Sequence, residues 1–308
     1  MSDNPVPHSA ADPHDTPHAS TPPATAASPV RFDGERLEPL FRIGLQSLDL
    51  DQWFEVDDLI EHYRAEKDRL NAAEGEAVYR EEPGSVSGQA EVRALIEDNL
   101  ARNHPGLSLP ADSGGSDLFE AARMVQEDLL LLSRDDSGWR LVAAALHFPS
   151  SWKLSEKFGL PLDQIHGNVP EFGPGTRNAA LMDRIFDGLK IDQPVQRMNW
   201  SLYPNATLYH PYSARSREAN PDRHSIDAKS FIRVERQTLR KLPQTGDILF
   251  TVRIYLDPLT QLAKHPGAID RLREYLLALT PAERDYKGLR TSINDIIAII
   301  DKFRAGTA

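Results

Sequence analysis

The stretch Asp128–Phe148, DLLLLSRDDSGWRLVAAALHF, decides the fold. Its two apolar runs, 128–133 and 139–148, flank the sequence Arg134–Gly138 (RDDSG), whose Asp, Ser and Gly residues favour tight turns. Two apolar runs joined by such a turn are typical of a β-hairpin. The stretch therefore predicts the start of an antiparallel sheet.

Three further strands are expected toward the C-terminus, because apolar or alternating segments there are bounded by Pro, Gly or Asp. They cover Asn199–Tyr203, Ser230–Thr238 and Ile248–Leu256. The connection 204–228 is rich in proline, which predicts an extended loop.

The segment 231–239, FIRVERQTL, alternates between apolar and polar residues. Ile232 and Val234 share one face, and the other face carries Phe231, Arg233, Glu235 and Gln237. Two interpretations stay open. The polar face is either a solvated side of the sheet or a set of polar groups that projects into a ligand site.

Helices are expected on both sides of these strands. Helical spacing of apolar residues predicts them at 53–71, 88–103, 121–126 with a cap at Ser116 or Asp117, 177–189, 266–279, 281–286 and 289–303. The helix at 281–286 carries a capping box, with Thr280 before Pro281 and Glu283 at the third position. The fold class is thus α+β, with N- and C-terminal helices around an antiparallel sheet of about five strands.

Composition excludes several classes of protein. The 308 residues are 40% hydrophobic, enough for a substantial core, and 35 Lys and Arg against 46 Asp and Glu give a net charge of −11 without a basic run. Nucleic acid is therefore not an expected partner. No stretch approaches the roughly 20 apolar residues that span a bilayer, and no secretory signal is visible, so no membrane association is expected and cytoplasmic residence is the default.

The chain contains no cysteine, which excludes disulfides, thiolate nucleophiles and cysteine-held iron–sulfur clusters. Signatures for dinucleotides, nucleoside triphosphates, zinc proteolysis and serine hydrolysis are also absent from the sequence. Any redox chemistry would need a borrowed cofactor. Residues 1–30 hold seven of the 23 prolines and few large apolar groups, so they are expected to form a disordered Pro/Ala/Ser-rich tail.

Three histidines stand where strands meet loops. His166, in the segment IHGNVP, is either a turn histidine bonded to a carbonyl or a ligand or general base. His147 ends an apolar strand and suits a core position, and His210 lies in a proline-bracketed loop and is expected to be exposed. None has a partner at metal-ligand spacing, so a zinc site is not expected.

Five segments in this order resemble the haem-dependent oxidative N-demethylase family, which includes the catalytic alpha subunit of dimethylamine monooxygenase. They are HFPSSW (147–152), KFGLPLDQIHGNVP (157–170), RMNWSL (197–202), RVERQTLRKLP (233–243) and FTVRIYLDPL (250–259). The resemblance implies a PAS-like sheet that binds haem b through an imidazole and activates dioxygen on the open side. Residues 31–308 would be this catalytic domain with helical extensions. Electrons from NAD(P)H would come through partner flavin and iron–sulfur proteins.

Site residues follow from the same resemblance. His166, in the context I-H-x-x-V-P, is expected to ligate the haem iron, with His147 and Asn199 also bordering the cofactor. Arg233 is expected to polarise the substrate or bound oxygen. The reaction implied is oxidative N-demethylation of a small secondary alkylamine.

The chain departs from the family pattern at one position. The loop after Asn-Trp reaches an acidic residue before a Leu in the family, whereas Thr207 precedes Leu208 here. A hydroxyl cannot balance a buried ammonium, so either the amine differs or another acid such as Glu235 takes the role. The alternatives to an enzyme for the usual amine are a non-catalytic haem-binding PAS-like sensor, a divergent member with a different substrate, and a haem-free packing domain.

Overall fold

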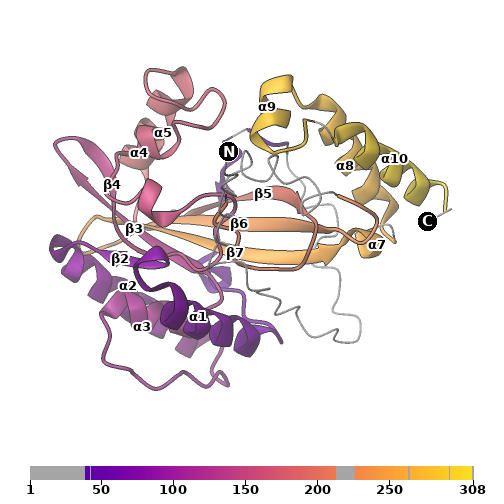
Figure 1. The fold of residues 1–308 in the computed structure, drawn as a ribbon. Coiled ribbons are helices and arrows are strands. Elements are labelled where there is room, and N and C mark those ends of the chain that lie inside the picture. The colour runs from indigo at the N-terminus through magenta and orange to yellow at the C-terminus, as the bar shows by residue number, and fades with distance from the viewer. Residues whose placement is uncertain (1–38, 42, 213–225, 263, 291, 307–308) are drawn as a thin grey trace, which may run out of the picture.

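The computed structural model describes residues 39–41, 43–212, 226–262, 264–290 and 292–306. The tail expected over residues 1–30 lies outside these residues, as does part of the loop expected over 204–228. The described chain is α+β, as the sequence predicts (Figure 1).

The centre of the fold is a seven-stranded antiparallel sheet in the order β1-β5-β6-β7-β3-β4-β2. Its strands are β1 (Gln46–Ser47), β2 (Tyr79–Glu81), β3 (Asp128–Asp135), β4 (Gly138–Ala145), β5 (Val195–Tyr203), β6 (Phe231–Lys241) and β7 (Ile248–Pro258). The expected hairpin is confirmed as β3–β4. The expected strand number was too low, because the edge strands β1 and β2 are too short to show an alternating pattern.

The helices are those of the sequence prediction with shifted ends and two short additions. They are α1 (Ile60–Glu74), α2 (Val86–Asn103), α3 (Asp117–Met124), α4 (Leu162–Ile165), α5 (Arg177–Gly188), α7 (Leu259–Leu262), α8 (Pro266–Ala278), α9 (Pro281–Tyr286) and α10 (Ile293–Arg304). The first helix begins at Ile60 rather than near Trp53. Trp53 is fully buried, but it lies before the helix, where the Asp57 carboxylate accepts the Leu59 amide.

The sheet presents a different surface on each side of β6. Ile232 and Val234 pack into an apolar cluster with α8 and α10. On the opposite face, Leu239 packs with Phe186 of α5, and the segment between β4 and α5 covers the rest. In Figure 1, α4 and α5 lie across the sheet from α1–α3, and α8–α10 gather at the other end. The polar residues of β6 therefore face the covering segment that contains His166.

Candidate functional site

Arg233 joins two of the family-like segments to the sheet. Its side chain is fully buried, and its guanidinium donates to Ser150 Oγ at 3.0 Å, to the Leu208 carbonyl at 3.0 Å and to the Phe148 carbonyl at 2.7 Å. The Tyr203 ring lies 5.4 Å from the guanidinium carbon. Arg233 thus holds the loop after β4 and the loop after β5 together, a task that suits its planar fork of donors.

Glu235 lies next along the same face of β6 and is the acceptor at the centre of the site. Its Oε2 accepts from Asn199 Nδ2 at 3.1 Å and from Gln237 Nε2 at 2.7 Å. Burial raises the pKa of Glu235, but the hydrogen bond from Ser150 and the charge of Arg233 outweigh burial. Its pKa therefore lies below the ordinary value, and Glu235 is a carboxylate at neutral pH.

The C-terminal helices reach the same site through Lys287, which follows α9. Lys287 Nζ donates to the Trp200 carbonyl at 2.8 Å, to Ser201 Oγ at 3.2 Å and to Asn199 Oδ1 at 3.4 Å. β1 pairs only with Val195 and Gln196 of β5, so the Trp200 carbonyl lies beyond that pairing. The lysine satisfies this carbonyl. Asn199 consequently links Lys287 on one side to Glu235 on the other.

His166 lies at the end of α4 on the covering segment. Its Nδ1 donates to the Leu162 carbonyl at 2.9 Å, and no residue of the described chain is hydrogen-bonded to Nε2. Burial lowers the pKa of His166 to about 4, with the charges of Lys157 and Arg197 acting in the same direction. The imidazole is therefore neutral, with its proton on Nδ1 and its lone pair on Nε2.

This state of His166 is the one that haem iron requires of a ligand. A ligating imidazole is neutral and commonly donates its other N–H to a backbone carbonyl, which fixes the tautomer and the ring orientation. The residues present therefore fit a haem held at His166 Nε2.

His147, by contrast, belongs to a buried cluster near α1. Its Nε2 donates to Asn71 Oδ1 at 2.8 Å, and its backbone amide donates to Asp128 Oδ1 at 2.9 Å. Burial, followed by the charge of Lys67, lowers its pKa well below the ordinary value. Its Nε2 is thus engaged by protein, as in a core histidine.

Thr207 lies in the loop after β5, half-buried, and its amide donates to Asn205 Oδ1 at 3.0 Å. The neighbouring Leu208 carbonyl accepts from Arg233. The structure thus brings together Arg233, Glu235 and Asn199, and it places Thr207 on a loop that Arg233 holds. His210 in the same loop is half-buried and stacks on Tyr203 with ring centroids 4.1 Å apart, so the expectation of an exposed histidine was wrong.

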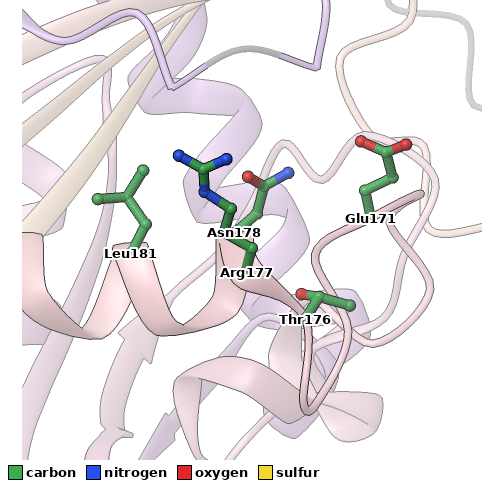
Figure 2. A pocket seen from close by; sticks show the side chains of 5 residues that line it. All are labelled: Glu171, Thr176, Arg177, Asn178 and Leu181. Atoms are coloured by element: carbon green, nitrogen blue, oxygen red, sulfur yellow. The ribbon is translucent and has the colours of Figure 1, made fainter.

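A pocket of about 490 Å³ opens beside the first turn of α5. It is lined by Glu171, Thr176, Arg177, Asn178 and Leu181. Figure 2 shows Arg177, Asn178 and Leu181 extending from one side of the helix, with Glu171 on the adjoining loop. Its volume falls within the range of small-molecule sites. None of these lining residues is one that the sequence predicts for the site.

Sequence reasoning missed four polar residues of the site. Lys157 and Ser150 fall inside quoted family-like segments, so their position was a signal that was not used. Arg197 opens the segment RMNWSL, and its charge lowers the pKa of His166. Lys287 carried no signal, because it follows a short helix about 50 residues after β6 in a region expected to be only a helical extension.

A comparison with known families gives one match. The family model described as "Haem-dependent oxidative N-demethylase, alpha subunit-like" matches residues 44–297. The match covers every strand and extends into α10. It therefore includes all the residues described above.

Proposed function

Because the chain belongs to the haem-dependent oxidative N-demethylase, alpha subunit-like family, we propose that it binds haem b through His166 and removes a methyl group from a small amine. The observation that carries this proposal is the hydrogen bond from His166 Nδ1 to the Leu162 carbonyl, which leaves Nε2 available on a neutral ring. The proposal also takes the sheet to be PAS-like, with one face serving a ligand under a helical cover.

The chain's own residues would bind and orient the amine. When bound, haem supplies the redox centre at which dioxygen is used to oxidise the methyl group. Glu235 is the carboxylate available to hold a protonated amine, because Thr207 carries no charge. Arg233 and Asn199 position Glu235, the first through Ser150 and the second directly. In this arrangement Arg233 is a positioning residue.

The reaction needs an electron pair that this chain does not generate by itself. With dioxygen, that electron pair and protons from solvent, an N-methyl amine gives the demethylated amine, formaldehyde and water. We place the source of the electrons in separate flavin and iron–sulfur proteins that take them from NAD(P)H. Cytoplasmic residence remains part of the proposal. Separately, no helix in the described ranges has the length and apolar content needed to cross a membrane.

The test begins with the visible spectrum of the purified protein after addition of haem. A strong Soret band is expected, and formaldehyde should appear when dimethylamine or another N-methyl amine is supplied with dioxygen and a reductase. Absence of the Soret band would refute haem binding. A Soret band without formaldehyde from any amine in a panel would favour the sensor instead of the enzyme.

A further inference from the structure

Lys157 lies on the segment that covers the polar face of β6, just before α4. Its Nζ stacks over the Trp152 ring at 4.4 Å from the centroid. The side chain is half-buried, and its ammonium has no hydrogen-bond acceptor and no ion pair at N···O contact distance in the part of the chain that the structure describes. An ammonium removed from water without an acceptor is costly. The free energy lost is recovered when an anion binds.

Two other lysines of the chain show what a structural lysine looks like here. Lys67 is fully buried and donates to the carbonyls of Ala122, Val125 and Glu127. Lys287 likewise donates to three acceptors on β5. Lys157 is buried enough for burial to lower its pKa to about 8, yet it has only the face of an aromatic ring. Packing alone gives no reason to hold a lysine at this place.

The charges around Lys157 favour an anion rather than a second cation. Its charge interacts with Glu235 and with His166, so the ammonium lies on the same side of the sheet as both. Glu235 is already compensated by the charges of Arg233 and Lys287. Arg197 adds a further positive charge near His166. The excess charge beside the expected haem ligand is therefore positive.

We propose that Lys157 binds a carboxylate of the small molecule that occupies this site. Resting on the proposed function, this carboxylate has two possible sources, a propionate of the haem or the carboxylate of an N-methyl amino acid substrate. Both present the same chemistry to the lysine. The aromatic face of Trp152 holds the side chain in position, so that little side-chain freedom is lost when the anion binds.

The first experimental arm titrates the protein with metal-free protoporphyrin IX and with its dimethyl ester, following porphyrin fluorescence. Neither porphyrin needs an iron ligand, so this arm does not depend on haem ligation or turnover. If the lysine binds a propionate, Lys157→Met should weaken the diacid by about 10- to 100-fold and leave the ester unchanged. Lys157→Arg should restore most of the loss. Lys153→Met is the matched control, since Lys153 stacks on Tyr212 in the same segment but is exposed.

The second arm titrates N-methylglycine and dimethylamine against the ferric spectrum of the haem-loaded protein. If the lysine binds a substrate carboxylate, Lys157→Met weakens N-methylglycine by a similar factor, leaves dimethylamine unchanged and does not alter porphyrin affinity. An effect in either arm that Lys157→Arg rescues supports the site and identifies the source. Unchanged affinities in both arms, or equal losses for Lys153→Met, would overturn the proposal while leaving haem-dependent demethylation intact.

Discussion

Two buried polar clusters of this protein contain the same kinds of side chain and differ in what remains available. The Lys67 cluster comprises Lys67, Asp128, His147 and Asn71, and the Glu235 cluster comprises Glu235, Arg233, Asn199, Lys157 and His166. In the first, the lysine meets three carbonyls and Asp128 accepts the amides of His147 and Phe148. In the second, Lys157 lacks an acceptor and His166 Nε2 lacks a donor among the described residues.

The difference separates structural polar groups from groups available for a ligand. Buried polar groups are almost always hydrogen-bonded, so each exception requires a reason. The Lys67 cluster satisfies the rule by binding backbone, and thereby fastens α1 to the entry and exit of the β3–β4 hairpin. In the Glu235 cluster the exceptions gather on one face of the sheet. A residue's type therefore says less about its role than the completeness of its hydrogen bonds.

The largest expected effect is on stability, from Lys67→Met compared with Lys157→Met. Lys67→Met removes a buried ammonium from three carbonyls and from Asp128, and should lower the free energy of unfolding by about 3–5 kcal/mol. Lys157→Met in the haem-free protein should change it by less than about 1 kcal/mol, because no hydrogen bond is lost. Denaturation with urea measures both. Equal losses for the two variants would remove the distinction between the clusters.

The next comparison sets His166→Ala against His147→Ala. The first should weaken haem binding by at least about 100-fold, since it removes the proposed protein–iron bond. The second should retain the Soret band but lose about 1–3 kcal/mol of stability, because Asn71 Oδ1 is left without its partner. Haem titration and thermal melting of both variants distinguish them. A normal Soret band in the His166 variant together with its loss in the His147 variant would exchange their roles.

A pH series sharpens the contrast between the lysines. Burial lowers the pKa of Lys157 to about 8 from an unfolded value of 10.5. Between these values the unfolded chain binds a proton that the folded protein lacks, so stability should rise with pH across this window and reach its low plateau below pH 8. The pKa of Lys67 is also lowered to about 8, so both wild type and Lys157→Met contain its slope. Their difference isolates Lys157, and an identical slope in the two proteins would contradict the assignment.

The sequence predicted much of the fold because long elements carry periodic patterns. The β3–β4 hairpin, the alternation along β6 and the capping box at Thr280 are confirmed. The edge strands β1 and β2 escaped prediction, since pairs and triplets of residues have no period. The first helix was predicted to begin too early, because apolar residues buried in a loop near Trp53 happen to follow helical spacing.

The candidate site was predictable only in part. His166 was recognised from its resemblance to a family segment, but its hydrogen bond to Leu162 depends on the geometry of α4. The alternation of β6 placed Arg233 and Glu235 on one face, while only the folded chain shows that Arg233 is occupied by two backbone carbonyls. Lys287 approaches from a distant helix, and such long-range contacts leave no local pattern in the sequence.

The smallest expected effect concerns Thr207, on the loop that Arg233 holds. If Glu235 is the carboxylate that receives the amine, a second carboxylate on this loop should help only modestly. Thr207 is half-buried, so solvent screens its interactions. Thr207→Glu should strengthen dimethylamine binding about two- to fivefold, whereas Glu235→Gln should weaken it more, because the charge at the centre is lost. Titration of dimethylamine against the ferric haem spectrum measures both variants, with Thr207→Gln as the neutral control. A gain that Thr207→Gln also shows would not be electrostatic, and unchanged affinity in Glu235→Gln would mean that the amine is held by a different acid.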